Sequence, residues 1–330
     1  MPQPDPQPRT AVTDYVARNF PGASLSPLAG DASTRRFFRI GLPDGTTHIL
    51  MDYGEPLDRP GDDVYFNRVF TVAELRVAEI LRISPQTGCL VQEDLGDTLL
   101  EQALETTDTQ KRLALLKQAA ALAADIHRLG TPVLAESGRA DGPALDADRL
   151  RFEMDFFLEH YAGAYRGRDH VDEFLRAGLH ELAGQAADTP ERVLCHRDYH
   201  SRNVMVLADG SLAMVDIQDA RWGPDSYDLA SLLRDAYVDI PEEWTEPLIR
   251  HYLDHLDEAP PYDEFKQRFD LVAAQRMIKA LGTFGYQIAA LGRTRYESAI
   301  PRTLTRLRAL LPQRDETRPL HEALDSADLL

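Results

Sequence analysis

The stretch C-H-R-D-Y-H-S-R-N at residues 195–203 contains an aspartate followed five residues later by an asparagine, in the pattern H-R-D-x-x-x-x-N. Apolar residues at 204–207 and 211–215 flank an Ala-Asp-Gly turn, which is a strong hairpin signal. The second of these segments runs into V-D-I-Q-D at 215–219. Because a hairpin returns antiparallel to its first strand, we expect Asp216 to lie near Asn203.

These residue types are the ones that phosphoryl transfer uses. The carboxylate of Asp198 can orient an attacking hydroxyl or accept its proton. Asn203 and Asp216 offer oxygen ligands that suit a Mg²⁺ ion holding nucleotide phosphates. Any one of these residues alone is more simply a cap or turn residue. The whole set, with a hairpin of matched length inside it, favours a catalytic interpretation.

The composition restricts the classes of protein and partner. The net charge of −18 over 330 residues argues against a nucleic-acid partner, which needs a basic face. No apolar run reaches the roughly 18–20 residues of a membrane helix, and the proline-rich start lacks the apolar centre of a secretory signal. Cys89 and Cys195 lie in apolar runs, so we expect core residues and no disulfide. We therefore expect a cytoplasmic monomer or weak dimer that acts on a small molecule.

The chain before residue 96 favours a small, mainly β domain. Residues 1–9 contain four prolines and are expected to be a disordered tail, followed by an amphipathic helix at 10–20. Strands are expected at 25–28, 35–40, 46–52 and 89–92, and a helix at 66–82. The loop of Gly30, Asp31, Ala32, Ser33 and Thr34 could cradle phosphate oxygens with its backbone N–H groups. It has one glycine, so an ordinary hairpin turn is the competing interpretation.

The rest of the chain is mainly helical in pattern. Helices are expected at 108–129, 147–165, 170–187, 227–237, 241–256, 261–291 and 301–311. We expect an interruption of the longest helix near Gly282 or Gly285, and fraying of the acidic end from residue 314. The polar bend at 93–97 is the expected hinge between two lobes.

Three segments carry a resemblance to a known family: H-R-D-Y-H-S-R-N at 196–203, V-D-I-Q-D-A at 215–220 and Y-D-L-A-S-L-L-R-D at 227–235. They resemble the aminoglycoside phosphotransferase family, small-molecule kinases of the protein-kinase-like fold. Other segments are similar to its bacterial branch that phosphorylates N-acetylmuramate and N-acetylglucosamine at the anomeric hydroxyl. These are G-D-A-S-T-R-R-F-F-R at 30–39, I-L-M-D at 49–52, E-D-L-G-D at 93–97, Q-D-A-R-W-G-P-D-S-Y-D-L at 218–229 and Q-R-M-I-K-A-L-G-T-F-G at 275–285.

The resemblance implies an α+β, protein-kinase-like fold with two lobes. A small, mainly antiparallel β N-lobe at residues 10–95 would bind the nucleotide. A large, mainly helical C-lobe at 96–330 would hold the catalytic loop and the sugar site. The implied reaction uses ATP and Mg²⁺ to convert N-acetylglucosamine or N-acetylmuramate to the 1-phosphate, in cell-wall sugar recycling.

The resemblance also implies roles for individual residues. Asp198 would be the catalytic base, Asn203 and Asp216 the magnesium ligands, and Asp228 a structural residue that holds the catalytic loop. The expected nucleotide contacts are Gly30, Asp31, Ala32, Ser33, Thr34, Arg36, Met51, Glu93, Asp94 and Leu95. The candidate sugar contacts are Glu153, His200, Arg202, Asp219 and Arg234, with Asp235, Trp222 and Tyr227 as further options. Ion pairs, caps or core positions are the competing interpretation for these sugar candidates.

One departure from the kinase pattern concerns positive charge. Kinases of this fold usually place a lysine on the third strand, but here the first lysine is Lys111 and the strand ends in Met51 and Asp52. The sugar-kinase branch also has Met-Asp there. We expect Arg35, Arg36 or Arg39 to supply the missing charge, because guanidinium binds phosphate in bidentate fashion. The competing interpretation is that these arginines pair with nearby acids.

Two alternatives to the amino-sugar kinase stay open. The acceptor could be an aminoglycoside or another small alcohol or amine, with the arginines near the motif favouring a neutral or anionic sugar instead. The chain could also be a nucleotide-binding pseudokinase or scaffold, which the missing lysine supports and the intact Asp198, Asn203 and Asp216 oppose.

Overall fold

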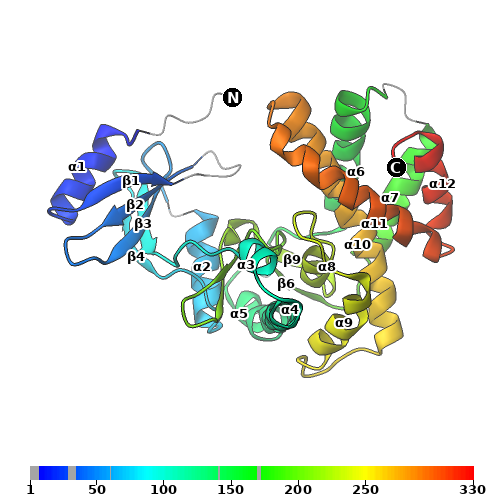
Figure 1. The fold of residues 1–330 in the computed structure, drawn as a ribbon, viewed down its shortest axis with the longest axis horizontal. Helices are drawn as coiled ribbons and strands as arrows, with labels where there is room; N and C mark the ends of the chain where they lie inside the picture. Colours follow the sequence, from blue (N-terminus) through cyan, green and yellow to red (C-terminus); the bar gives the residue numbers. More distant parts are fainter. Residues whose placement is uncertain (1–6, 29–34, 60, 140–141, 169–171) are drawn as a thin grey trace. The chain divides into compact units, whose positions relative to one another are not determined.

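The computed structural model describes residues 7–28, 35–59, 61–139, 142–168 and 172–330, which form two compact units. The first unit contains the chain up to residue 98 and the segment 205–219, and the second contains 99–204 and 220–330 (Figure 1). The segment 205–219 was expected in the C-lobe. It groups with the first unit because the Met214 N–H donates to the Arg76 carbonyl at 2.9 Å and the Val206 N–H to the Thr98 carbonyl at 2.9 Å.

The first unit is built on a five-stranded antiparallel sheet. Its strand order is β1-β2-β3-β5-β4, and every neighbouring pair is antiparallel. The strands are β1 (Ser24–Leu28), β2 (Arg36–Gly41), β3 (Thr47–Asp52), β4 (Ile80–Ser84) and β5 (Cys89–Glu93). The P-D-G turn joins β2 to β3, with Gly45 at φ 90°, a left-handed conformation that glycine adopts without strain. The expected strands are therefore confirmed, and β4 is additional.

Helix α1 (Thr10–Asn19) covers one face of this sheet. Its buried residues, Val12, Tyr15 and Val16, pack against buried side chains of the three central strands: Phe38, Ile40, Leu50, Cys89 and Val91. Because side chains alternate along a strand, the neighbours of these residues point to the opposite face. The open face, defined here as the sheet face that α1 does not cover, therefore carries Met51.

In the first unit, one expected helix is shorter than predicted, and the last residues of the expected disordered tail are ordered. The helix expected at 66–82 is α2 (Asp62–Val72), which ends before Glu74, a residue at φ 57°. Of the apolar residues that continued the helical spacing, Ala73 and Val77 are buried in a connecting segment, where Val77 pairs with Met214 in a parallel bridge, and Ile80 and Leu81 begin β4. The tail expected at 1–9 is described from residue 7. Arg9 is ordered by Asp52 and by the Thr87 carbonyl, which its Nη2 contacts at 2.8 Å.

The second unit is mainly helical and holds the catalytic loop. Its larger helices are α3 (Leu100–Thr106), α4 (Thr109–Asp125), α5 (Thr131–Glu136), α6 (Ala147–Phe157), α7 (Glu173–Ala187), α8 (Tyr227–Leu233), α9 (Thr245–Leu253), α10 (Tyr262–Gly285), α11 (Ile300–Leu310) and α12 (Arg318–Ser326). Strands β6 (Arg192–Cys195) and β9 (Arg221–Pro224) pair antiparallel. The predicted hairpin of β7 (Val204–Val206) and β8 (Leu212–Met214) is formed, and from residue 205 it belongs to the first unit. The catalytic loop, residues 196–203, joins β6 to β7.

Helix α10 is the longest of the described helices, and it packs against α6, α7, α8 and α11 (Figure 1). The interruption expected near Gly282 or Gly285 lies at Gly285, where the α-helix ends and a π-helical turn, η5 (Tyr286–Ala290), begins. The two glycines also allow close packing. A Cβ on Gly282 would lie 2.8 Å from Cα of Phe157, and one on Gly285 would lie 2.5 Å from the His160 carbonyl oxygen.

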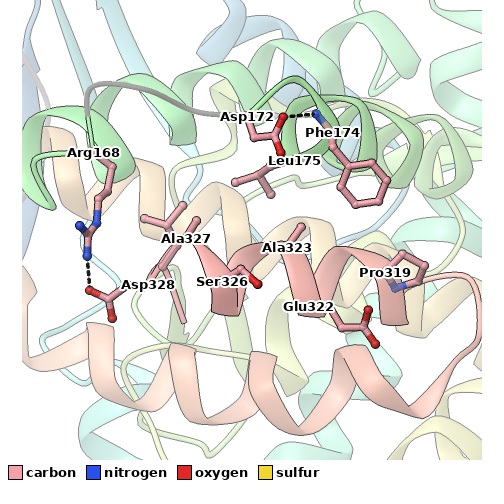
Figure 2. Close-up of a pocket in the computed structure, with 11 residues that line it drawn as sticks. Arg168, Asp172, Phe174, Leu175, Pro319, Glu322, Ala323, Ser326, Ala327 and Asp328 are labelled. Atoms are coloured by element: carbon pink, nitrogen blue, oxygen red, sulfur yellow. Dashed lines mark hydrogen bonds and ion pairs between the residues drawn. The ribbon is translucent and has the colours of Figure 1, made fainter.

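The C-terminal segment is ordered, which corrects the expectation of fraying. Helix α12 packs on α7 and buries Leu320 and Leu324, and Leu330 is buried as well. A pocket lies between the start of α7 and α12, beside the exposed ring of Phe174 (Figure 2). None of its lining residues belongs to the catalytic loop. No helix in the described part of the chain is long and apolar enough to cross a membrane.

Candidate active site

The catalytic loop is anchored by two buried aspartates. Asp228, in the first turn of α8, accepts hydrogen bonds from the backbone N–H of His196 at 2.7 Å and of Arg197 at 3.0 Å. Arg197 has φ 79°, so its backbone conformation is one that a non-glycine residue adopts at a cost. Asp235 accepts from the backbone N–H of Ser201 at 2.7 Å. The two carboxylates fix both halves of the loop and thereby the position of Asp198 between them.

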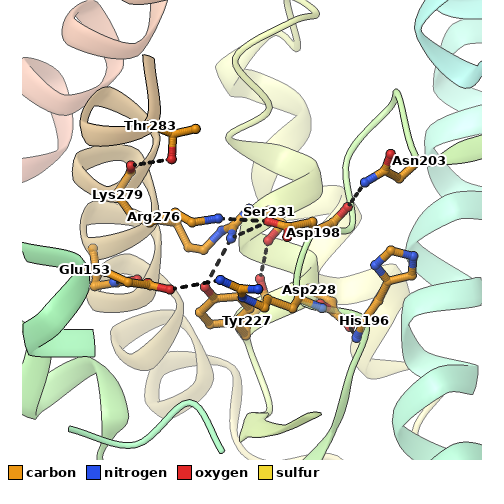
Figure 3. A network of polar contacts seen from close by, with 12 residues as sticks. Glu153, His196, Asp198, Asn203, Tyr227, Asp228, Ser231, Arg276, Lys279 and Thr283 are labelled. Carbon is orange, nitrogen blue, oxygen red and sulfur yellow. Dashed lines mark hydrogen bonds and ion pairs between the residues drawn. The ribbon is translucent and has the colours of Figure 1, made fainter. Parts of the chain in front are cut away.

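The carboxylate of Asp198 is held by two cations from α10 (Figure 3). Its Oδ1 lies 2.9 Å from Nζ of Lys279 and 3.5 Å from Nη1 of Arg276. No residue in the described part of the chain hydrogen-bonds its other oxygen, Oδ2. The side chain of Asp198 is 25% exposed, so a ligand can reach it. The arrangement fixes one oxygen of the carboxylate and leaves the other available.

The charges around Asp198 set its protonation state. Burial by itself would raise its pKa, but Lys279, Arg197 and Arg276 outweigh this effect and hold the pKa of Asp198 well below its usual value. Burial lowers the pKa of Lys279, while the Asp198 carboxylate partly offsets that change. Asp198 is therefore ionised at neutral pH, as a group that takes a proton from a hydroxyl must be.

A buried polar network continues behind Asp198. Glu153 of α6 accepts a hydrogen bond from Nε2 of Gln275 at 3.0 Å and lies 3.5 Å from Nη2 of Arg197. Arg276 donates to the hydroxyl of Tyr227 at 3.1 Å, and its guanidinium lies over that ring, 4.8 Å from the centroid. Glu153 therefore contacts Asp198's neighbours, and the buried ring of Tyr227 holds Arg276 in place.

The two expected metal ligands lie in different units and are described separately. Nδ2 of Asn203 donates to the backbone carbonyl of Asp198 at 2.9 Å, so the side-chain oxygen of Asn203 is left as a ligand atom. In the first unit, Asp216 has φ 61°, and its exposed carboxylate accepts from Nε2 of Gln218 at 2.7 Å. Oxygen donors of this kind fit Mg²⁺, which prefers carboxylate and carbonyl ligands.

The structure gives two of the candidate sugar contacts other partners. Arg202 forms a two-bond pair with Glu101, at 2.9 and 2.8 Å, and stacks on the ring of Tyr237. Arg234 is buried and bonds Thr245 at 3.0 Å and Glu242 at 2.9 Å. The expected helix at 227–237 ends at Leu233, just before it. These contacts favour the structural interpretation of Arg202 and Arg234.

The other sugar candidates differ in accessibility. His200 is half-buried near the ring of Tyr237, and burial lowers the pKa of His200, which keeps the imidazole neutral. Asp219 ends the short helix η3 (Ile217–Asp219) of the first unit and is half-buried. Tyr227 is fully buried and therefore a core residue, whereas Trp222 of β9 is half-buried.

The candidate nucleotide residues lie on and after the β-sheet, except for the loop from Gly30 to Thr34, which falls outside the described residues. Arg36 faces Asp52 across β2 and β3 and bonds its buried carboxylate at 2.6 Å, on the face that α1 covers. Arg39 instead binds Asp94 at 2.6 Å and Asp97 at 2.7 Å. The competing interpretation, pairing with acids, therefore describes both arginines.

Arg35 differs from these two because it lies beside Met51. Its Nη1 is 3.7 Å from the Met51 sulfur and 3.6 Å from Asp63, and its guanidinium lies over the ring of Tyr53. Glu93, the last residue of β5, binds Arg76, with one contact of 2.7 Å. Leu95 is half-buried.

Sequence reasoning missed Arg276 and Lys279, the two cations on Asp198. The segment at 275–285 contributed to the resemblance, but no role was assigned to its residues. One signal was available: Arg276, Lys279 and Thr283 recur at helical spacing and interrupt an otherwise apolar, buried stretch of α10.

Comparison with known proteins identifies the family. The model of the phosphotransferase enzyme family, APH, matches residues 24–265. The chain belongs to this family. It is an ATP-dependent phosphotransferase, as the resemblance of the three motif segments implied.

Curated relatives and solved structures agree with this assignment. The N-acetylmuramate/N-acetylglucosamine kinase of Neisseria meningitidis serogroup B is 30% identical, over 94% of this chain and 92% of the relative. The protein of the same name from Pseudomonas aeruginosa is 29% identical over 93% and 89%.

The solved structures of an ethanolamine kinase from Plasmodium vivax and of the ADP-bound aminoglycoside phosphotransferase APH(2'')-Ib each give a TM-score of 0.61. They are 15% and 10% identical and cover 93% and 95% of this chain, and 89% and 99% of their own. They confirm the protein-kinase-like fold.

Proposed function

We propose that this phosphotransferase transfers the γ-phosphoryl group of ATP to the anomeric hydroxyl of an amino sugar, N-acetylglucosamine or N-acetylmuramate, and so makes the sugar 1-phosphate. The observation that carries the proposal is the Asp198 carboxylate, in which Oδ1 is held by two cations and Oδ2 accepts from none of the described residues. The names of relatives that match most of the chain support the choice of acceptor. Recycling of cell-wall sugars is the role that suits this product.

In the proposed reaction, Oδ2 of Asp198 accepts a hydrogen bond from the anomeric hydroxyl and orients its oxygen toward the γ-phosphorus. The carboxylate takes the hydroxyl proton as the new P–O bond forms and the bond to the ADP leaving group breaks. Lys279 and Arg276 keep Asp198 ionised before that step and fix its orientation. Few further groups are needed, because phosphoryl transfer depends mainly on positioning and charge neutralisation.

Asn203 and Asp216 are the proposed ligands of Mg²⁺, through the side-chain oxygens that their other contacts leave available. When bound, the ion would neutralise charge on the nucleotide phosphates. The hydrogen bond from Asn203 to the Asp198 carbonyl also stiffens the loop, which links the position of the proposed metal ligand to that of the proposed base.

For the nucleotide, the proposed contacts are the backbone from Glu93 through Asp94 to Leu95 at the adenine edge, Met51 on the open face, and the loop from Gly30 to Thr34 at the phosphates. Arg35 is the best candidate for the missing positive charge, because it lies beside Met51 and 3.6 Å from Asp63, whereas Arg36 and Arg39 bond aspartates at 2.6 Å. This choice narrows the three arginines of the sequence-based hypothesis to one.

For the sugar, His200 is the strongest of the expected contacts. Its buried Nδ1 has no hydrogen-bond partner among the described residues, and its neutral ring can donate or accept a hydrogen bond with a sugar hydroxyl. Glu153 would affect the sugar site indirectly, through its contact with Arg197. Asp219 remains a candidate contact to the sugar. Arg202 and Arg234 shape the surroundings of the loop.

A transfer assay tests the proposal. The purified chain is incubated with ATP and Mg²⁺ and, separately, with N-acetylglucosamine, N-acetylmuramate and kanamycin, and products are detected by mass spectrometry. We expect phosphorylated amino sugar. Asp198→Asn keeps the size of the side chain and loses its charge. Because a general base contributes about 10²–10⁴-fold in rate, we expect the rate of transfer to fall by that factor in this variant.

Each other outcome of the assay favours a specific alternative. Transfer to kanamycin but to neither amino sugar would identify an aminoglycoside phosphotransferase. Binding of nucleotide without transfer to any acceptor would favour a scaffold. Equal transfer by wild type and Asp198→Asn would remove Asp198 from its proposed role.

A further inference from the structure

The ammonium group of Lys279 has more hydrogen-bond donors than acceptors among the described residues. Its ammonium group carries three N–H donors, and among the described residues its hydrogen-bond partner is Oδ1 of Asp198. Arg276 contacts the same oxygen, so Lys279 is not the sole anchor of the carboxylate. A second acceptor can therefore bind Lys279 while Arg276 still holds Asp198.

The two cations differ in how firmly they are held. Arg276 is fixed by the hydroxyl and ring of Tyr227, and its side chain is 10% exposed. Lys279 has no such support, and its side chain is 17% exposed on a flexible four-carbon stem. Lys279 is therefore the cation that can turn toward a ligand at Asp198.

Charge around Asp198 favours an anionic ligand. The charged side chains that act on Lys279 are Asp198, Arg276, Glu153 and Arg197, and Arg149 also lies 3.6 Å from Glu153. The next acid, Asp228, is occupied by two backbone N–H groups of the catalytic loop. An ammonium group that is partly removed from water is stabilised by a further negative charge beside it.

We propose that Lys279 is a specificity-determining residue that binds a carboxylate on the acceptor. Resting on the proposed function, this makes N-acetylmuramate, whose lactyl ether carries a carboxylate, a better acceptor than neutral N-acetylglucosamine. One ammonium group then binds both the proposed base and the acceptor's acid, and so places the hydroxyl of an anionic sugar beside Asp198. Thr283, one turn further along α10, and Tyr286, the first residue of η5, are half-buried and extend the surface available to a sugar substituent.

The test compares the ratio of kcat/KM for N-acetylmuramate to kcat/KM for N-acetylglucosamine at saturating ATP and Mg²⁺. Any effect of Lys279 that acts through Asp198 affects both sugars and cancels in this ratio. In Lys279→Met we expect the ratio to fall about tenfold or more, mainly through KM for the anionic sugar, because a charge-assisted hydrogen bond is lost. Lys279→Arg keeps the charge and should restore most of the ratio.

Lys266→Met is the matched control. Lys266 lies on the same helix and forms an ion pair of the same kind, with Asp270 at 2.6 Å, but it does not contact the catalytic loop. In Lys266→Met, the ratio of kcat/KM for N-acetylmuramate to kcat/KM for N-acetylglucosamine should equal that of wild type. An equal loss for both sugars in Lys279→Met, or a wild type that does not favour N-acetylmuramate, would overturn the inference and leave the proposed function standing. Transfer to neither sugar by the wild type would overturn both.

Discussion

Nζ of Lys279 lies 2.9 Å from Oδ1 of Asp198, across 81 residues of sequence. This contact joins helix α10 to the catalytic loop and fixes one oxygen of the carboxylate that the motif marks as the base. Its consequences are electrostatic as well as positional, because the ammonium favours the ionised form of Asp198.

The pH dependence of Lys279→Met tests the electrostatic role. The pKa of Asp198 is depressed, so its ionised form persists to lower pH than in an ordinary aspartate, whose pKa is about 3.9. Activity that needs the carboxylate is lost as pH falls through the folded-state pKa. Removing Lys279 takes away the strongest of the depressing charges, so the acid limb of kcat/KM should move to higher pH.

This shift is measured with N-acetylglucosamine, the neutral acceptor, from about pH 3 to pH 8, a range that spans the ordinary aspartate pKa and neutrality. Lys266→Met serves as the control, and its acid limb should coincide with that of wild type. An acid limb that stays in place or moves to lower pH in Lys279→Met would contradict the role assigned to Lys279.

Asp228→Asn should damage the catalytic loop. The amide oxygen can accept a single strong bond in place of the two that the carboxylate accepts from His196 and Arg197, and a buried N–H left unpaired costs about 1–3 kcal/mol. We expect a lower free energy of unfolding and a lower kcat, with KM for ATP little changed. Asp148→Asn, at a carboxylate that is 94% exposed, is the control and should change neither. Unaltered kcat in Asp228→Asn would contradict the anchoring role.

Substitutions of two arginines in the first unit should affect different quantities, the melting temperature for Arg36 and KM for ATP for Arg35. Arg36 pairs with the buried Asp52, so Arg36→Met should lower the melting temperature and leave KM for ATP close to that of wild type. Arg35→Met should do the reverse and raise KM for ATP by about tenfold, as expected for one charge-assisted phosphate contact. Enzyme kinetics and thermal unfolding on the same samples decide between these roles. If Arg35→Met leaves KM for ATP unchanged, Arg35 does not replace the missing strand lysine.

The packing of α10 gives a prediction about stability. Gly285→Ala places a Cβ 2.5 Å from the His160 carbonyl oxygen, so the helices must move apart, at a cost of about 1–3 kcal/mol. Gly184→Ala on α7 is the matched control, since its Cβ meets Arg151 at an ordinary 3.6 Å and alanine is the better helix former. Chemical denaturation should show Gly285→Ala as the less stable variant. Equal stability would mean that close helix contact at Gly285 is not required.

The contrast between Asp198 and Lys279 shows what sequence reasoning could reach. Asp198, Asn203 and the hairpin are contiguous, and their spacing alone predicts a phosphoryl-transfer loop. Lys279 reaches Asp198 through tertiary packing of α10. Helical periodicity reports which face of a helix is apolar, but not which element covers it.

The same distinction explains the errors in secondary structure. Residues 73–79 continue the helical spacing of α2, yet they form an irregular segment in which Leu75 and Val77 are buried. These side chains are apolar because they are buried, and not because the segment is a helix. Gly282 and Gly285 suggest a break when α10 is considered alone. In the folded chain, Gly282 packs against α6, and Gly285 packs against η2 (Leu158–Tyr165), the π-helical segment that follows α6. Both positions therefore need a residue without a Cβ.

The position of the phosphoryl group on N-acetylglucosamine tests the central claim most directly. The product of the wild-type reaction with ATP and Mg²⁺ is treated with borohydride and analysed by mass spectrometry. An anomeric phosphate blocks reduction, so the account predicts a sugar phosphate whose mass does not change. A product that gains two hydrogens, as a reducing 6-phosphate would, contradicts it.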